Sequence, residues 1–317
     1  AGARRFRITT GFRDDEANVR LVELLRGAAA DVGGDVAIYF DVSRGAKLRL
    51  LHDEPRAVVA GDEVVVAVRP APGELPVERD LPPLDGGTVV YAGDAEVELE
   101  LVDADVGRWR FRAVHDGFIR PRKALSAPGV VFGHGAVNAE NRADLESAAR
   151  LAVDFAVLSF VDGPEDVEAG RAALAGSAAE VGVVAKVETV AAMARLDAVV
   201  AAADEVMVAR GDLALQLPYE DLGVHQWRIL AACERAGVPG IVATQLLESV
   251  IERRVPNRAE ILDVSTAVAL GARSIMLGPE TCTNPDLVRA IETAARIIDA
   301  VARSGSVLRW EPGPAGQ

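Results

Sequence analysis

Short runs of hydrophobic, mostly β-branched residues recur along the chain, and each is followed by an alanine-rich stretch with helical spacing. Seven such runs occur, at Arg5–Thr10, Val36–Asp41, Phe155–Phe160, Val181–Glu188, Glu205–Arg210, Gly240–Thr244 and Ser274–Gly278. They are almost continuously apolar, which is typical of parallel strands buried on both faces. Helical spacing is clear in residues 222–236 and 284–300. The alternation predicts an α/β fold, and separations of about 24–34 residues favour a TIM-type (β/α)8 barrel over a doubly wound sheet.

A closed barrel of this type needs eight strands, and the pattern supplies seven. The missing strand is most simply the one before Arg5, and the chain begins with Ala1 rather than Met. We therefore expect the first βα unit to be missing from this chain. The barrel is predicted in two parts, residues 1–50 and 126–303.

Residues 51–125 break the strand–helix rhythm. They are rich in valine, proline, glycine and aspartate, and apolar and polar residues alternate at 64–68, 97–101 and 108–114. This pattern predicts a small all-β domain, inserted after the Val36–Asp41 strand, which is the third strand of a complete barrel. A domain inserted there is well placed to act as a lid. Residues 304–317, whose end is rich in proline and glycine, are predicted to form a loose tail.

Composition excludes several classes of protein. Half of the 317 residues are hydrophobic, so a disordered chain is not expected, and no apolar run is long enough to cross a membrane. The net charge of −14 argues against binding to nucleic acid. The two cysteines exclude a disulfide scaffold and fit a reducing cytoplasm.

Lysine is rare in this chain, whereas arginine is common. Only Lys47, Lys123 and Lys186 are lysines among the 34 basic residues. The two residue types are nearly equivalent as solvated surface charge, but they differ where chemistry needs a compact ammonium. The three lysines are therefore candidates for a functional site, with chance survival on the surface as the alternative.

Polar residues stand at the carboxyl end of every predicted strand, where barrel enzymes carry their catalytic groups. They are Arg7, Thr9 and Thr10; Asp41; Ser159; Lys186 and Glu188; Arg210 and Asp212; Thr244; and Glu280 and Thr281. Glu188 and Asp212 come from neighbouring strands and suit Mg²⁺ or Mn²⁺. Strand alternation places Lys186 on the same side as Glu188, where its ammonium can stabilise an enolate or a transferring phosphoryl oxygen. A buried ion pair without chemistry is the alternative.

Two further strand-end residues suit a bound anion. Gly211 allows backbone N–H groups to approach an anion closely, and Thr244 adds a hydroxyl donor. Thr244 is equally explained as a residue that favours strands.

Long motifs in the second half of the chain resemble the pyruvate kinase family. They are VVAKVE, MVARGDLALQLP, ATQLLESV, NRAEILDVSTAV and SIMLGPET, and they follow one another between residues 127 and 300. AGARRFRI, AIYFDVSRGAKLRL and LSFVDGPEDV are similar to earlier family motifs, less closely. The resemblance implies an eight-stranded barrel with a small β domain inserted after the third strand.

The resemblance also implies roles for single residues. It makes Lys186 the lysine beside the transferring phosphoryl group, and Glu188 and Asp212 the ligands of Mg²⁺ or Mn²⁺. The backbone of Gly211 and Asp212, with Thr244, corresponds to the cradle for the substrate carboxylate. The other positions are Arg7 at the phosphoryl group, Arg49, Lys123 and Asp94 on the nucleotide side, and Ser159, a strand-end residue that we add as a substrate contact.

Departures from the family pattern change two expectations. Relatives that require potassium bind it at positions that read Thr9, Gly11, Asp41 and Val42 here, so that site is mostly lost. Relatives with lysine at the position of Lys47 are potassium-independent, so the resemblance implies no potassium requirement. The Lys47 ammonium, together with Asp41, would replace the ion's charge. The nucleotide side has also changed, since Phe12 stands where the family has histidine.

Three functions remain open. The first is a phosphotransferase acting between phosphoenolpyruvate and ADP or a related acceptor, in the manner of pyruvate kinase. The second is a metal-dependent lyase, or other enolate chemistry on a pyruvate-like 2-oxo acid. The third is a non-catalytic homologue that depends on a partner. We expect a homo-oligomer or a partner that covers the incomplete barrel, because unpaired strand edges need covering.

Overall fold

Seven parallel strands form one curved sheet in the computed structural model, which describes residues 2–177 and 179–305. In spatial order they are β1 (Arg5–Thr9), β2 (Ala37–Val42), β12 (Phe155–Leu158), β13 (Gly182–Val187), β14 (Glu205–Ala209), β15 (Gly240–Ala243) and β16 (Ser274–Met276). All seven strands predicted from the sequence are present. The predicted α/β barrel architecture is confirmed.

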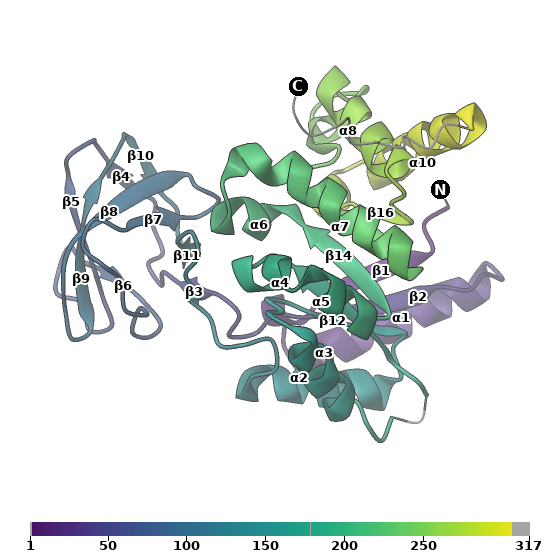
Figure 1. Ribbon diagram of the computed structural model, residues 1–317, viewed down its shortest axis with the longest axis horizontal. Coiled ribbons are helices and arrows are strands. Elements are labelled where there is room, and N and C mark those ends of the chain that lie inside the picture. Colours follow the sequence, from purple (N-terminus) through teal and green to yellow (C-terminus); the bar gives the residue numbers. More distant parts are fainter. Residues whose placement is uncertain (1, 178, 306–317) are drawn as a thin grey trace, which may run out of the picture.

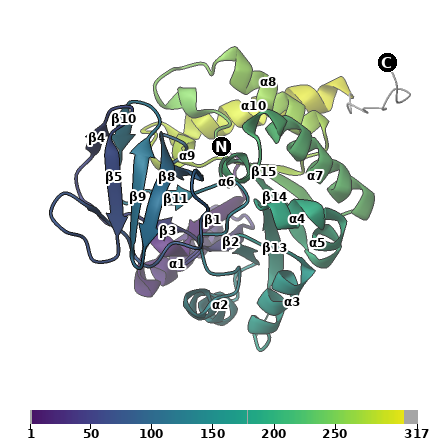
Figure 2. The same cartoon turned by 60° about the vertical axis from the view of Figure 1, so that its left-hand side comes forward.

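Helices surround this sheet, most of them on its outer face, and one follows β14 directly at the carboxyl end of the strands (Figures 1 and 2). They are α1 (Asp15–Asp31), α2 (Ala139–Leu151), α3 (Pro164–Ala173), α4 (Val190–Ala194), α5 (Leu196–Ala202), α6 (Arg210–Gln216), α7 (Leu222–Ala236), α8 (Arg258–Ala269), α9 (Pro279–Cys282) and α10 (Leu287–Ser304), with 3-10 turns η1 (Thr10–Phe12), η2 (Tyr219–Asp221) and η3 (Glu248–Ile251). The helix predicted at 222–236 is α7. The one predicted from 284 begins at Leu287, because the Asp286 side chain caps it by accepting from the Arg289 N–H at 3.2 Å. The predicted tail beyond Gly305 lies outside the described residues.

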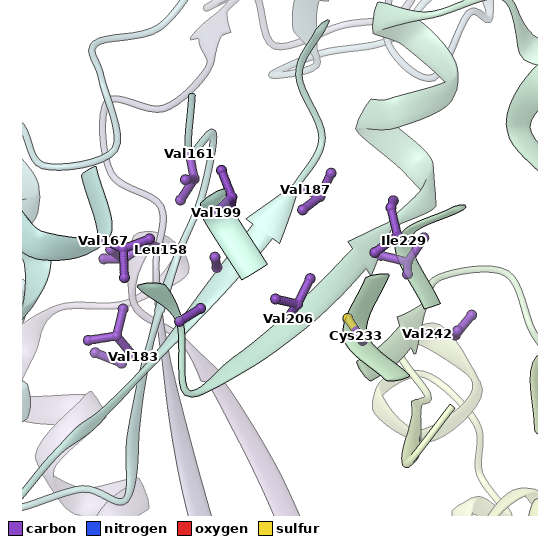
Figure 3. Close-up of a cluster of buried hydrophobic side chains, with 14 of the residues drawn as sticks. Leu158, Val161, Val167, Val183, Val187, Val199, Val206, Ile229, Cys233 and Val242 are labelled. Atoms are coloured by element: carbon purple, nitrogen blue, oxygen red, sulfur yellow. The ribbon is translucent and has the colours of Figure 1, made fainter. Parts of the chain in front are cut away.

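Alternate side chains of each strand enter two separate cores. Val157, Val184, Met207 and Ile241 point inward, into a small cluster that fills the barrel. Their neighbours pack outward against the helices in a larger cluster that includes Leu158, Val183, Val206, Ile229 and Val242 (Figure 3). Burial on both faces is the physical reason for the continuous apolar runs in the sequence.

The barrel is open along one side. β1 pairs only with β2, and β16 pairs only with β15; within residues 2–177 and 179–305 no strand joins these two edges. The opening lies between β1 and β16, the two edges of the seven-stranded sheet. In the same residues, no helix is both long and apolar enough to cross a membrane.

A second, separate sheet is built from residues between β2 and α2 and stands beside the barrel (Figure 1). Its strands are β3 (Leu48–Arg49), β11 (Ala124–Ser126), β7 (Val89–Ala92), β8 (Val97–Asp105), β9 (Arg108–Ala113), β5 (Glu63–Ala67) and β6 (Leu75–Pro76), and β4 (Arg56–Val58) pairs with β10 (Gly117–Ile119). Val64, Leu99 and Phe111 are fully buried in its own hydrophobic core. Their alternation with polar residues is the pattern that predicts these strands.

The two segments that connect barrel and second sheet lie against each other. The His134 N–H donates to the Gly45 carbonyl at 2.9 Å. A Cβ placed on Gly133 would lie 1.9 Å from the Ala46 carbonyl oxygen, so only glycine permits this approach. The connection is therefore packed backbone against backbone.

Replacing Gly133 by alanine is expected to lower the free energy of unfolding by about 3 kcal/mol, because the methyl group meets backbone that cannot move aside. Urea denaturation measures the change. Gly135→Ala is the matched control, since a Cβ at Gly135 meets nothing within 4 Å. Equal stabilities of the two variants would contradict this account.

Candidate active site

Lys186 and Glu188 lie together at the carboxyl end of β13. The Lys186 Nζ is 3.3 Å from Glu188 Oε2 and donates to Ser159 Oγ at 3.0 Å. Glu188 is completely buried, and Lys186 is 9% exposed. Charged groups at this depth persist only when they are paired with one another or with ligands. Three residues predicted from strand ends are thus in direct contact.

The two oxygens of Glu188 differ in their surroundings. Oε1 accepts from the Phe160 N–H at 2.7 Å, while Oε2 accepts no hydrogen bond. Burial raises the pKa of Glu188 to about 7; the Lys186 ammonium opposes this rise, and the Asp212 charge adds to it. Burial lowers the pKa of Lys186, but Glu188, Asp41 and Asp212 raise it by more in total. Lys186 therefore stays charged, and Glu188 gains from any further cation beside Oε2.

Asp41 extends this cluster toward β1. Its carboxylate accepts from Arg7 Nη1 at 3.1 Å and from Ser159 Oγ at 3.3 Å. Arg7, Asp41, Ser159, Lys186 and Glu188 therefore form one continuous chain of polar contacts. This chain runs over four neighbouring strand ends, β1, β2, β12 and β13.

Lys47 contacts Asp212. Its Nζ donates to Asp212 Oδ1 at 2.6 Å and lies 6.0 Å from the centre of the Phe160 ring. Asp212 is in the first turn of α6, directly after β14. Asp41, which the sequence groups with Lys47 as the substitute for potassium, accepts from Arg7 Nη1. The role of Lys47 as a substitute for potassium stays a prediction.

Thr244 adopts a strained backbone just after β15. Its φ of 72° is unfavourable for a β-branched residue, and its Oγ1 is buried without a hydrogen-bond partner. A Cβ on Gly211 would lie 3.9 Å from that hydroxyl, so Gly211 and Thr244 face each other across the strand ends. A buried hydroxyl without a partner is a polar group available to a ligand.

Two charged side chains hold the Thr244 loop in place. Arg210 donates to the carbonyls of Ala243 and Gln245 at 3.1 and 3.2 Å, and also to that of Thr244. Asp263 fixes the guanidinium with two contacts of 2.8 Å. Glu280 accepts from the Leu246 and Leu247 N–H groups, both at 3.1 Å. The sequence places Arg210 and Glu280 among the polar strand-end residues, where catalytic groups are expected. In the structure, both side chains instead support the loop around Thr244.

The residues predicted on the nucleotide side line one cavity of about 180 Å³ between the barrel and the second sheet. Arg49, Asp94, Lys123, Lys47 and Asp212 all belong to it. The Lys123 Nζ is 3.2 Å from an Asp94 oxygen, and Arg49 Nη1 donates to the Arg122 carbonyl at 3.2 Å. Tertiary structure thus joins residues far apart in the chain to Asp212.

The site suits a divalent metal that keeps open positions. Glu188 Oε2 is a buried carboxylate oxygen without a hydrogen bond, and its pKa shows the influence of Asp212. The described residues hold no cluster of three or more acidic, histidine or cysteine side chains able to bind a metal. Mg²⁺ commonly uses only one or two carboxylates and completes its shell with water and substrate oxygens. Glu188 and Asp212 fit that mode of binding.

Two site residues carry no chemical signal in the sequence. Phe160 orients Glu188 through its N–H and lies near Lys47 with its ring, in a backbone with φ of 54°. Gln216, at the end of α6, donates to the carbonyls of Ala127 and Val130 at 3.0 and 3.2 Å and so ties α6 to the connecting segment. Phe160 acts through its backbone N–H and its ring, and Gln216 acts through its side-chain amide; only the fold brings these groups into place.

A family model described as "Pyruvate kinase, barrel domain" matches residues 1–285. The chain belongs to the pyruvate kinase family. It is 35% identical to "Pyruvate kinase" of Methylorubrum extorquens, over 99% of this chain and 68% of that protein. It is 33% identical to "Pyruvate kinase" of Agrobacterium vitis, over 94% of this chain and 64% of that protein, and 30% identical to "Pyruvate kinase 2" of Synechocystis sp., over 95% and 53%. The chain thus spans about half to two thirds of the length of these pyruvate kinases.

Proposed function

We propose that this chain transfers a phosphoryl group between phosphoenolpyruvate and ADP, with a divalent metal and without potassium. The observation that carries the proposal is the contact of buried Lys186 with Glu188, whose pKa is also influenced by the charge of Asp212, together with the buried, unpartnered Thr244 hydroxyl after β15. Family membership and relatives that are named pyruvate kinase support it.

The charges of the site suit this substrate. Arg7, Lys47 and Lys186 are balanced by Asp41, Glu188 and Asp212, so the cluster has no net formal charge. Phosphoenolpyruvate, an anion with two charged groups, would enter together with a divalent cation, and the added charges largely cancel. Such a site stabilises a transferring phosphoryl group by position and charge rather than by forming a covalent bond to it.

Each residue has one task in the proposed reaction. Arg7 binds the phosphoryl oxygens, and Lys186 donates to the substrate oxygen that becomes negative as the phosphorus–oxygen bond breaks. The Thr244 hydroxyl donates a hydrogen bond to the substrate carboxylate beside Gly211. Arg49 and Lys123 bind the phosphates of the nucleotide, with Asp94 orienting Lys123. A bound Mg²⁺, held by Glu188 and Asp212, would neutralise phosphoryl charge.

A phosphorus NMR time course with phosphoenolpyruvate, Mg²⁺ and ADP in potassium-free buffer tests the proposal. We expect the signals of ATP to appear as those of phosphoenolpyruvate decline. Enolate chemistry without phosphoryl transfer would instead exchange the methyl protons of pyruvate in D₂O and leave ADP unchanged. That result, or unchanged phosphoenolpyruvate, would refute the proposal.

Lys47→Met is expected to reduce kcat/KM for phosphoenolpyruvate about 100-fold, because it removes one of three positive charges from the cluster. The wild-type rate should be the same in potassium and in tetramethylammonium chloride of equal ionic strength. Steady-state rates in both salts measure the two effects. A wild-type enzyme that requires potassium would contradict the role of Lys47.

A further inference from the structure

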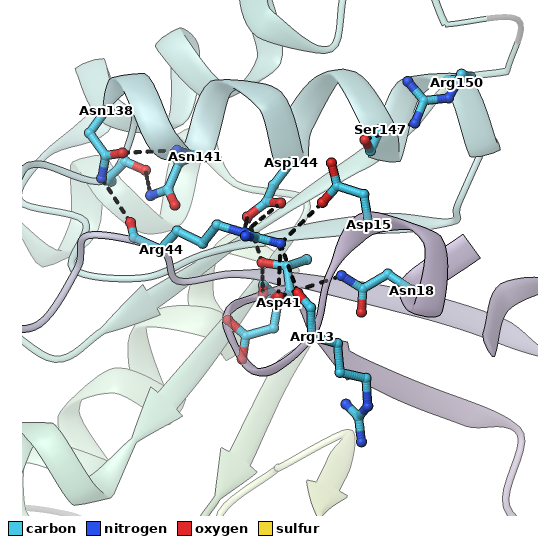
Figure 4. Close-up of polar contacts among 12 residues, drawn as sticks. Arg13, Asp15, Asn18, Asp41, Arg44, Asn138, Asn141, Asp144, Ser147 and Arg150 are labelled. Carbon is cyan, nitrogen blue, oxygen red and sulfur yellow. Dashed lines mark hydrogen bonds and ion pairs between the residues drawn. The ribbon is translucent and has the colours of Figure 1, made fainter. Parts of the chain in front are cut away.

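The loops that follow β1 and β2 are joined by one guanidinium, that of Arg44. Its Nε lies 3.0 Å from both carboxylate oxygens of Asp144, on α2. Its Nη2 donates to the carbonyls of Thr10 and Arg13 at 3.2 and 3.0 Å, and to Asp15 Oδ1 at 3.1 Å. Figure 4 shows the side chain lying between these three segments. Arg44 therefore connects the β1 loop, the β2 loop and α2.

Asp144 is the buried carboxylate that anchors the Arg44 guanidinium. It is 1% exposed and also accepts from Thr10 Oγ1 at 2.7 Å, while Thr10 Oγ1 lies 3.1 Å from the Asp41 carbonyl. Burial raises the pKa of Asp144, and the hydrogen bonds from Thr10 and Arg44 offset part of this rise. Thr10 therefore links Asp144, on α2, to the backbone of Asp41 in β2.

The loops that Arg44 joins follow the strands of two charged active-site residues, and one of the loops leads to a third. Arg7 and Asp41 lie in β1 and β2, and Lys47 follows Arg44 by three residues. The backbone between Arg44 and Lys47 is fixed as well, because Asn138 Nδ2 donates to the Arg44 carbonyl at 3.0 Å and the His134 N–H to Gly45 at 2.9 Å. Arg44 and Lys47 therefore lie on one short segment, whose backbone is held at Arg44 and Gly45 and whose Arg44 side chain is held by the β1 loop and α2.

We propose that Arg44 is a positioning residue, which fixes Arg7, Asp41 and Lys47 relative to one another for the reaction. The inference rests on the proposed function. A planar guanidinium has donors in a fixed fork, which can meet a carboxylate on one edge and two carbonyls on another. Lysine has a single ammonium on a flexible stem and cannot make this set of contacts. The effect on the reaction is one of geometry, since the Arg44 guanidinium contacts Asp144, Asp15 and loop carbonyls rather than the side chains of Arg7, Asp41 or Lys47.

The paired variant Arg44→Gln with Asp144→Asn tests the proposal without leaving a buried charge unpaired. We expect its melting temperature to stay within a few degrees of wild type and its kcat to fall about 30-fold, with KM for phosphoenolpyruvate changed less than threefold, because misplaced groups weaken binding in the transition state most. Arg44→Lys should also remain well below wild type. Arg20→Gln is the control, since Arg20 is exposed and pairs with the exposed Glu16 at 2.6 Å.

Hydrogen exchange supplies a readout that does not depend on activity. In the paired variant, amides of residues 9–15 and 43–47 should exchange at least tenfold faster than in wild type, while those of β8 stay unchanged. An active wild type with an equally active paired variant would overturn the positioning role, as would unchanged exchange in these loops. A wild type that transfers no phosphoryl group would overturn the proposed function and the catalytic part of this inference, and the exchange rates would still decide whether Arg44 holds the loops.

Discussion

Replacing Lys186 by methionine is expected to reduce phosphoryl transfer from phosphoenolpyruvate to ADP about 1,000-fold. Its ammonium is buried, is held 3.3 Å from Glu188 and 3.0 Å from Ser159, and stays charged because three carboxylates raise its pKa. A single charged donor aimed at a developing oxyanion in a site of this kind contributes about 3–4 kcal/mol to transition-state stabilisation. Methionine fills a similar volume and supplies no charge.

A coupled assay of pyruvate formation measures this loss, and exchange of pyruvate methyl protons in D₂O provides a second readout. Both should decline, because the same ammonium stabilises the enolate. Circular dichroism and the melting temperature must show that the variant is folded. Arg20→Gln, on the surface of α1, should retain the wild-type rate. A folded Lys186→Met variant with more than a tenth of the wild-type rate would refute the assignment.

Glu188→Gln is expected to weaken Mn²⁺ binding at least about 100-fold, measured by the electron paramagnetic resonance signal of free Mn²⁺. Glutamine keeps the shape of the side chain and can still accept from the Phe160 N–H, but it cannot ionise. Phosphoryl transfer should fall to the background rate at the Mn²⁺ concentrations that saturate wild type. Glu16→Gln, on an exposed carboxylate of α1, is the control.

The same measurement, repeated across a range of pH, should show Mn²⁺ affinity that depends on pH in a definite direction. Burial raises the pKa of Glu188 to about 7, so a proton competes with the metal below that pH, and wild-type affinity should fall as pH falls, about tenfold per unit. Lys186 remains charged over this range, since its pKa is raised. The Glu188→Gln variant should show little of this dependence. Equal pH profiles in both proteins would exclude Glu188 as the titrating ligand.

Some of the site follows from strand periodicity alone. Lys186 lies in β13 and Glu188 directly follows that strand, two residues later, so strand alternation places them on the same side. The apolar runs also place three polar residues at strand ends: Asp41, Ser159 and Thr244. Parallel strands bring their carboxyl ends to one edge of the sheet, so these residues lie on that edge. These positions are encoded by the local pattern, which is why the sequence predicts them.

Other features of the site depend on contacts between residues that are far apart in the sequence, which no local pattern predicts. The partner of Lys47 is Asp212, 165 residues later, and the partner of Asp41 is Arg7. Arg210 is one of the polar strand-end residues of the sequence, but its guanidinium is engaged by Asp263 and by loop carbonyls. Which of several strand-end charges pair with each other is decided by barrel curvature and side-chain packing.

The sequence by itself determines the seven strands, the helices between them, the separate β-rich segment and the residues that carry chemistry, because these follow from local periodicity and from long collinear motifs. Only the tertiary structure decides that Glu188 has a buried oxygen without a hydrogen bond, that Thr244 is held in a strained conformation, and that Arg44 joins two loops to Asp144. Burial and hydrogen-bond pairing depend on the surroundings of each atom, which residues distant in the chain supply.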